Sequence, residues 1–184
     1  MKQKSIILGC YIFLLMCLCN SCDDKDQFQT FIKQLTKLDT PVTFNSKIDY
    51  ELNLQYPKNN QFFISIQNEY PGFGVCGLFF ETKEFVAILG NIPTANGTPI
   101  ILTFDKNGKK IDAHALFENV MGDLGKYVSN SETILPNMQF VFTDSTITRK
   151  ITADGSEEIP DTDSLSVKTK KYIIDKTGKF IQTE

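Results

Sequence analysis

The segment Ile111-Asp-Ala-His-Ala-Leu-Phe117 places an acid two residues before the only histidine of the chain. Side chains alternate along a strand, so Asp112 and His114 are predicted to share one face. A carboxylate that orients an imidazole is the positioning half of a Ser-His-Asp device. The sequence has no Gly-Xaa-Ser-Xaa-Gly elbow to supply the serine. We therefore expect Asp112 and His114 to be a solvent-facing pair, and keep catalysis by them as an alternative.

The first 22 residues carry the pattern of an export signal. Lys2 and Lys4 give a positive start, residues 6–19 are almost unbroken apolar, and Ser21-Cys22 closes the segment. This ending resembles that of bacterial lipoproteins, in which cleavage precedes the cysteine and diacylglycerol is attached to its sulfur. The resemblance implies a signal peptide over 1–21 and a lipid anchor at Cys22. Each buried methylene then contributes about 0.8 kcal/mol to attachment.

Cleavage there leaves 163 of the 184 residues, a length typical of one domain, so we expect residues 28–184 to form it after a lipidated tether at 22–27. The remaining chain carries 17 basic and 22 acidic residues, a net charge of −5. This charge argues against nucleic acid and against adsorption to an anionic membrane by charge alone. The expected membrane contact is the lipid anchor.

The residue types give little support for thiol or metal chemistry. Cys76 is the one cysteine after Cys22 and lies in an apolar run, so we expect an inert buried thiol. One histidine and one thiol do not make a typical zinc set. We expect residues 153–166 to form a solvated loop rather than a divalent-ion site, despite five acids: Asp154, Glu157, Glu158, Asp161 and Asp163. No metal and no cofactor is predicted.

The apolar pattern predicts one helix followed by strands. Phe28, Phe31, Ile32, Leu35 and Leu38 form a stripe at helical spacing, which predicts a helix over 28–38. Residues 118–131 and 153–166 are expected to be irregular. Short apolar runs separated by turn residues predict strands at 42–45, 50–55, 61–67, 73–80, 84–90, 98–105, 109–117, 133–143, 145–152, 167–174 and 178–182.

Two strand–turn–strand units repeat. Thr103-Phe-Asp-Lys-Asn-Gly-Lys-Lys-Ile-Asp112 matches Ile173-Ile-Asp-Lys-Thr-Gly-Lys-Phe-Ile-Gln182, which aligns Asp105 with Asp175. The glycine suits the positive φ of a turn, and the Asp side chain can accept from turn amides, so we predict hairpins rather than calcium loops. The fold class is therefore mainly all-β, an antiparallel meander arranged as a barrel, a sandwich or a partial propeller.

Taken together, the sequence resembles small Bacteroidetes-type lipoproteins of uncharacterised function. The features that carry the resemblance are Ser21-Cys22, the acidic run Asp23-Asp24-Lys25-Asp26, the Leu38-Asp-Thr-Pro41 entry and the two hairpins. In that group, such an acidic run resembles a signal for display on the outer face of the outer membrane. Asp144-Ser145-Thr146 and Asp163-Ser164-Leu165 resemble its O-glycosylation motif, which implies glycans on Ser145 and Ser164.

Three functions are compatible with these features. We expect a non-enzymatic interaction module that is lipid-anchored in the outer membrane and exposed on the cell surface, with the periplasmic face as the alternative, and with a protein, peptide or glycan ligand. An envelope hydrolase that uses carboxylates or His114 is one alternative. An immunity or inhibitor lipoprotein that caps a toxin or protease is another. Residues 118–131 and 153–166 are the segments where a partner is expected to bind.

Overall fold

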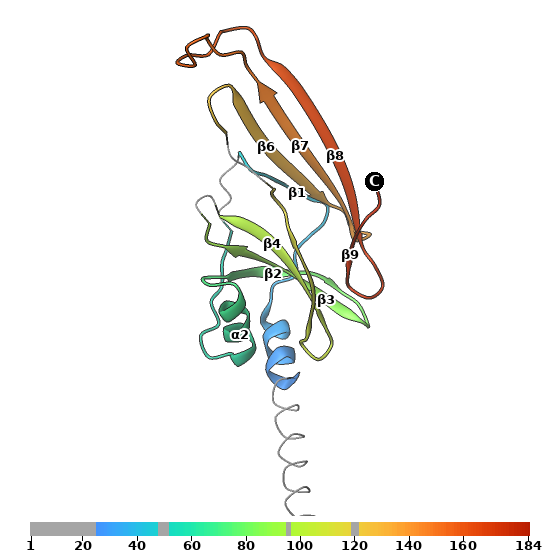
Figure 1. The fold of residues 1–184 in the computed structure, drawn as a ribbon. Coiled ribbons are helices and arrows are strands. Elements are labelled where there is room, and N and C mark those ends of the chain that lie inside the picture. The colour runs from blue at the N-terminus through green and yellow to red at the C-terminus, as the bar shows by residue number, and fades with distance from the viewer. Residues whose placement is uncertain (1–24, 48–51, 95–96, 119–121) are drawn as a thin grey trace, which may run out of the picture.

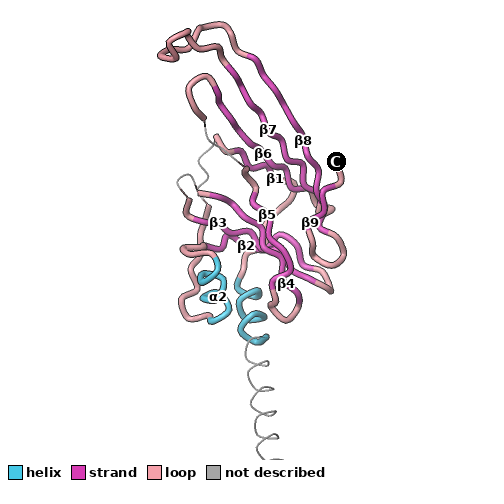
Figure 2. The backbone as a smooth tube through the Cα atoms, viewed as in Figure 1, coloured by secondary structure: helices cyan, strands magenta, loops and turns pink. Residues whose placement is uncertain are grey.

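The computed structural model describes residues 25–47, 52–94, 97–118 and 122–184. Across these residues the chain forms two antiparallel sheets and two helices, which confirms the mainly β fold (Figures 1 and 2). Both sheets are open, with strand orders β2-β3-β4-β5 for the first and β1-β6-β7-β8-β9 for the second. The closed barrel among the predicted arrangements is therefore not the one adopted.

The chain order of the elements gives each sheet a mostly meandering path. The N-terminal helix is described over residues 25–34. The other elements are β1 Val42–Asn45, α2 Gln61–Glu69, β2 Gly74–Glu81, β3 Phe85–Ile92, β4 Thr98–Asp105, β5 Lys110–Ala115, β6 Lys126–Ile134, β7 Gln139–Thr148, β8 Ser164–Ile174 and β9 Phe180–Gln182.

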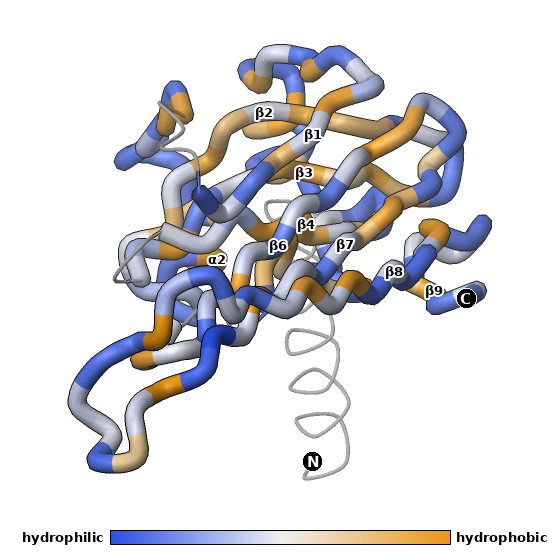
Figure 3. The backbone as a smooth tube through the Cα atoms, turned by 90° about the horizontal axis from the view of Figure 1, so that it is seen from above, coloured by the Kyte–Doolittle hydropathy of each residue, from blue (hydrophilic) through white to orange (hydrophobic). Residues whose placement is uncertain are grey.

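The first sheet is the middle of three layers. Its strands β2 and β3 are nearly continuous hydrophobic stretches (Figure 3), as expected for strands covered on both faces. Val86 and Ile88 join the cluster under the helices, whereas Phe85 and Leu89 join the cluster shared with the second sheet. The alternation of side chains along one strand thus fastens both outer layers to the same sheet.

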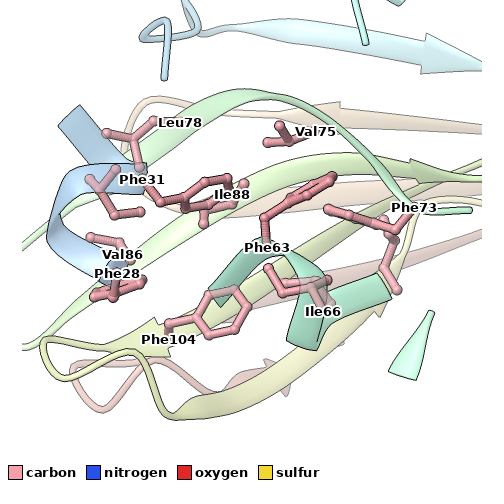
Figure 4. Close-up of a cluster of buried hydrophobic side chains, with 13 residues drawn as sticks. Phe28, Phe31, Phe63, Ile66, Phe73, Val75, Leu78, Val86, Ile88 and Phe104 are labelled. Atoms are coloured by element: carbon pink, nitrogen blue, oxygen red, sulfur yellow. The ribbon is translucent and has the colours of Figure 1, made fainter. Parts of the chain in front are cut away.

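The N-terminal helix is part of this core. Phe28 and Phe31 are fully buried in the cluster that they share with Phe63 of α2, and Figure 4 shows all three side chains in this cluster. The first part of the predicted stripe, Phe28, Phe31 and Ile32, is confirmed as buried, but the described helix runs from 25 to 34 rather than from 28 to 38. Residues 25–27 of the predicted tether are therefore helical.

After this helix the chain crosses the edge of the first sheet. The Leu78 amide donates to the Thr36 carbonyl at 2.9 Å, and the Leu38 amide donates to the Leu78 carbonyl at 2.8 Å. Leu38 consequently packs on the cluster between the sheets, away from the rest of its predicted stripe. This crossing also covers part of the outer edge of β2, because Thr36 and Leu38 form hydrogen bonds with the backbone groups of Leu78.

The predicted strand at 61–67 is wrong, because this segment is the helix α2. Asn60 caps it, with its side-chain oxygen accepting from the Phe63 amide at 2.9 Å. The Asn60 amide group also donates to the Gln27 carbonyl at 3.0 Å, which ties α2 to the N-terminal helix. Phe63 and Ile66, three residues apart, are the buried pair. The short Phe-Phe-Ile-Ser-Ile run is compatible with the spacing of a strand and with that of a helix. Packing against the first sheet decides in favour of the helix.

The predicted single strand at 133–143 is also wrong. A turn at Leu135–Met138 separates β6 from β7, with the Leu135 amide bonded to the Gln139 carbonyl at 2.8 Å. Pro136 and Asn137 are the turn residues that the apolar run concealed. Residues 126–131, expected to be irregular, are the polar first part of β6. Of the predicted strand 145–152, only the part up to Thr148 is strand.

The two repeated hairpins are confirmed in detail. Asp105 accepts from the amides of Asn107 and Lys109 at 2.8 and 2.9 Å through Oδ1. Asp175 does the same for Thr177 and Lys179 at 2.7 and 3.0 Å. The carboxylates are therefore used by the turns, as the hairpin interpretation requires.

The second hairpin also holds the two sheets together. Thr103 of β4 donates its hydroxyl to the Gly178 carbonyl at 2.7 Å, and this contact is buried. The Phe180 amide of β9 donates to the Asp112 carboxylate of β5 at 2.9 Å. The outer edge of β5 is thereby placed against the second sheet, and the packing of the two sheets does not depend on apolar contacts alone.

Candidate functional site

The predicted anchor lies outside the described part of the chain, as do Asp23 and Asp24 of the predicted export signal. Lys25 and Asp26 are described, and both are exposed on the N-terminal helix. This helix lies at the opposite end of the molecule from the connection between β7 and β8 (Figure 1). The signal and the lipid remain predictions, and the described structure places their neighbours at one extremity. Within the described ranges, no helix is long and apolar enough to cross a bilayer.

Asp112 and His114 do not form the predicted solvent-facing pair. The Asp112 carboxylate accepts from the backbone amides of Ala113 and Phe180. The His114 side chain is only 11 % exposed and bonds Glu132 of β6, with 2.7 Å between Nε2 and Oε1. The two residues share a strand face, as predicted, but the second sheet covers that face and gives each of them a different partner.

Glu132 is the residue that the sequence interpretation missed. It is fully buried, and its Oε2 has no hydrogen-bond partner in the described structure. Burial raises its pKa, opposed by the hydrogen bond and charge of His114. The sequence gives only a weak indication of this burial. Asn130, Glu132 and Ile134 occupy every second position of β6, and all three lie on its buried face.

The His114 ring is enclosed by aromatic side chains from the second sheet. It stacks on Phe180 at 4.8 Å between centroids, and lies 4.9 Å from Tyr172 and 5.8 Å from Phe140. A hydrogen bond between two such enclosed side chains fixes how the two layers meet. Chemistry on a substrate would require access to the imidazole, and these rings restrict that access.

The single described thiol is consistent with the predicted inert cysteine. Cys76 is buried, and desolvation raises its pKa to about 12, so the thiol stays protonated at neutral pH. It lines the apolar floor of a cleft of about 380 Å³ between β1 and the first sheet, together with Phe44, Phe79 and Leu89. The exposed side chains of Thr36, Asp39, Asn53 and Gln55 form the rim.

Metal ligands do not gather in the part of the chain that the structure describes: no group of three or more His, Cys, Asp or Glu side chains is close enough to share an ion. The acids of the 153–166 segment illustrate why. Glu158 and Asp163 both face Arg149, and Asp154 accepts from Thr152 and Ser156 in its own turn. Each of these three carboxylates is therefore already paired with a guanidinium or hydrogen-bonded within its turn.

The two predicted glycosylation sites lie on opposite faces of the second sheet. Ser145 is half-buried in the middle strand β7, where it pairs with Ser129 and Val167 on the outer face. Ser164 is exposed at the start of β8. Glycosylation at either position is untested and stays a prediction.

Four apolar side chains, three of them exposed and Ile147 half-buried, gather on the outer face of the second sheet, close to the β7–β8 connection. Tyr127, Ile147 and Leu165 lie side by side on three neighbouring strands, and Val167 follows Leu165 on the same face. We call these four residues the distal patch. Leu165 is 65 % exposed and Val167 54 %, the highest values among the described large hydrophobic residues. Such a cluster is typical of an interaction surface.

An ionic network holds the segment next to the distal patch. Arg149 forms two bonds to Asp163, of 2.5 and 2.9 Å, and one of 2.7 Å to Glu158. Glu158 in turn accepts from the Tyr127 hydroxyl and from the Gly125 amide. These bonds lower the pKa of both carboxyls, so each stays ionised at neutral pH.

The guanidinium also lies over the Tyr127 ring, 5.9 Å from its centroid. The 149–163 segment therefore has a fixed internal geometry, although most of it is exposed. Residues 164–166 of the expected loop belong to β8.

Comparison of the chain with protein-family models, with curated proteins and with solved structures gives no match. The distal patch, the buried His114–Glu132 pair and the cleft are accordingly interpreted from their geometry alone.

Proposed function

We propose that this chain is a lipid-anchored, non-enzymatic interaction module of the cell envelope, and that the distal patch binds its partner. The observation that carries the proposal is that Leu165 and Val167, the most exposed of the described large hydrophobic residues, lie on β8 next to the β7–β8 connection, and that this connection is at the end of the molecule farthest from the N-terminal helix (Figure 1). Exposed apolar area in water is unfavourable, and a partner that covers it gains the corresponding free energy.

The position of the predicted anchor supports this orientation. Lys25, at the described start of the N-terminal helix, is three residues from Cys22 in the sequence. A lipid on Cys22 would hold this end of the molecule close to the bilayer and direct the distal patch away from it. We propose the outer face of the outer membrane as the location, on the strength of the Asp23-Asp24-Lys25-Asp26 run, with the periplasmic face as the alternative.

A protein or peptide partner fits the distal patch better than a glycan. Tyrosine and arginine are frequent at the centre of protein interfaces, and Tyr127 is held here by Arg149 through Glu158. Three of the four patch residues are aliphatic, which suits an apolar partner surface. An immunity or inhibitor role is one form of this proposal, in which the partner is a toxin or a protease.

The hydrolase alternative is not favoured by the geometry of the residues on which it rested. His114 is hydrogen-bonded to Glu132 and surrounded by aromatic rings, and the Asp112 carboxylate accepts from the Phe180 amide of β9. We therefore do not propose catalysis at these positions.

The anchor is tested by metabolic labelling with a palmitate analogue in cells that express the wild-type chain or Cys22→Ala. We expect label and membrane association in the wild type, with loss of both in the variant. Protease shaving of intact cells then reports the membrane face. An unlabelled wild-type protein released into the medium would contradict the proposal.

The interaction surface is tested by a photoactivatable amino acid placed at position 165 in the full chain on intact cells. We expect a discrete cross-linked partner. The matched control is the same substitution at Lys33, exposed on the N-terminal helix at the other end of the molecule. Identical cross-links from both positions, or none from position 165, would refute the assignment of the distal patch.

A further inference from the structure

The outer edge of β8 is an open strand edge over most of its length. β9 pairs only with Tyr172, Ile173 and Ile174 of β8, and the last residues of the chain extend the contact to Lys171. In the described structure, residues 164–170 therefore have a strand neighbour on the β7 side only. The exposed edge of a sheet is a template for an added strand.

The backbone hydrogen bonds of residues 171 and 174 fix which backbone groups of β8 face outward. Lys171 donates to the Glu184 carbonyl and accepts from the Thr183 amide, so its backbone groups point away from β7. The Ile174 amide bonds Met138 on the β7 side. Because these directions alternate in an antiparallel strand, the N–H and C=O groups of Leu165, Val167 and Thr169 face the open edge.

The side chains beside this edge differ between the two faces. Leu165 and Val167 are exposed on the outer face, as part of the distal patch. Lys168 and Lys170 lie on the opposite face, in register with Asp144 and Phe142 of β7. Lys170 bonds Glu118 at 2.7 Å, whereas Lys168 is not within ion-pair distance of any described carboxylate. An added strand thus meets apolar groups on one face and positive charge on the other.

The two edges of the first sheet contrast with this one. The edge of β2 is occupied by residues 36–38 and by Gln55, which exchanges two hydrogen bonds with Val75. The edge of β5 faces β9 through Asp112. Lysines on an open edge commonly protect it from pairing, but here the two most exposed hydrophobic residues accompany them.

We propose that the β8 edge, residues 164–170, binds an extended segment of a partner protein in which apolar and acidic residues alternate. The partner strand donates to and accepts from the Leu165, Val167 and Thr169 backbone, a mode of recognition known as β-augmentation. Its apolar side chains extend the distal patch, and its carboxylates face Lys168 and Lys170. The inference rests on the proposed interaction role and assigns its partner chemistry.

A second copy of this chain is a less suitable occupant. Antiparallel pairing of two β8 strands about Val167 brings the two Lys168 side chains onto neighbouring diagonal positions, where like charges repel. The same pairing points the two N-terminal helices in opposite directions, which two chains anchored in one membrane cannot satisfy.

The binding test uses two labelled seven-residue peptides with the full chain in detergent, one alternating valine with glutamate and the other valine with lysine. Fluorescence anisotropy is expected to show the glutamate peptide binding about tenfold more tightly, less so at high salt. Equal binding of the two peptides, or none, would overturn the proposal. A peptide-independent dimer in sedimentation would overturn it in favour of a second copy.

Two edge variants test the strand geometry. Val167→Pro removes an outward-facing N–H and is expected to lower the affinity for the glutamate peptide about tenfold. The control Val167→Thr keeps that N–H and is expected to bind the peptide as the wild type does. Lys168→Glu should abolish the preference for the acidic peptide.

A third measurement needs no variant. Peptide binding should slow hydrogen exchange at the Leu165, Val167 and Thr169 amides and leave the Lys168 amide, already directed to β7, unchanged. Uniform protection, or none, would refute augmentation. The cross-linking experiment above separates this failure from that of the interaction role, because it succeeds with any partner on the distal patch.

Discussion

At the scale of single residues, the contact between His114 and Glu132 is the most consequential one. It joins β5 of the first sheet to β6 of the second, with Glu132 fully buried and the His114 side chain only 11 % exposed. A buried polar contact of this kind is weak evidence for net stability, because the desolvation of its groups offsets their attraction. Its value lies in specifying how the two sheets meet, since removal of one partner leaves the other buried polar group without its hydrogen bond.

We predict that Glu132→Gln becomes progressively more stable than the wild type as the pH rises above the ordinary glutamate value of 4.5. The folded state raises the pKa of Glu132, so it holds the proton more tightly than the unfolded chain does. Stability from this group is therefore full below the unfolded pKa and is lost as the pH rises through the folded pKa. Urea unfolding at several pH values from 4 to 8 measures the difference.

The companion variant is His114→Ala, which removes the only side chain bonded to Glu132 in the described structure. We expect this variant to lower the free energy of unfolding by about 3 to 5 kcal/mol at neutral pH, because the buried carboxyl group of Glu132 is left without a partner. Combining it with Glu132→Gln should recover part of this loss. A pH-independent difference between the wild type and Glu132→Gln would show that the Glu132 carboxyl is not perturbed by burial.

At the scale of elements, the second hairpin is predicted to be sensitive to a single methyl group. Gly178 has a φ of +89°, and a Cβ there would lie 2.8 Å from Ile111 and 3.2 Å from Phe85. Gly155→Ala is the matched control, because Gly155 also has a positive φ, +74°, but nothing within 4 Å of the added atom.

We expect Gly155→Ala to cost about 1 kcal/mol from backbone strain alone, and Gly178→Ala to cost about 1 to 3 kcal/mol more from the clash. Thermal and chemical unfolding of the two variants measure this difference. Equal losses would mean that the hairpin is not pressed against the first sheet as described.

The ionic network beside the distal patch is predicted to loosen in acid. The folded state lowers the pKa of Glu158 and of Asp163, so the stability they contribute is present above their ordinary values of 4.5 and 3.8. It is lost as the pH falls through the lower folded values. The Gly125 amide, which donates to Glu158, should lose its protection from exchange in that range, after normalisation to its intrinsic rate.

Arg149→Ala should give the same loss of protection at neutral pH, while core amides of β3 stay unchanged. Lys150→Ala alters the exposed neighbouring residue and serves as the control. Protection of the Gly125 amide that survives both acid and Arg149→Ala would mean that the network does not order this segment.

At the scale of the whole molecule, the N-terminal helix is predicted to be structural rather than a spacer. Phe28 is fully buried and lies beside Gly108 of the first repeated hairpin, so the helix is packed on the sheet. We expect Phe28→Ala to destabilise the full chain by about 3 to 5 kcal/mol. Lys33→Ala, exposed on the same helix, should change it by no more than about 0.5 kcal/mol.

Chemical unfolding of the two variants measures these losses. An effect of Phe28→Ala as small as that of Lys33→Ala would show that the helix is only a tether. If the prediction holds, the distal patch and the N-terminal helix belong to one body. The proposed lipid anchor would then present the distal patch at a fixed distance from the bilayer.

The sequence alone determined the features that depend on near neighbours. The turn chemistry of Asp105 and Asp175, the buried stripe of Phe28, Phe31 and Ile32, and most strands are local patterns, and they are confirmed. Hydrogen bonds within a few residues and the period of burial are written directly into the order of residue types.

Only the tertiary structure decided which faces meet. The helix α2, the partner of His114, the burial of Glu132 and the open edge of β8 depend on residues far apart in the chain. Short apolar runs fit two periods, and a charged residue on a strand does not reveal whether its face will be covered. That outcome depends on how two sheets pack, because burial and pairing are properties of the assembled layers.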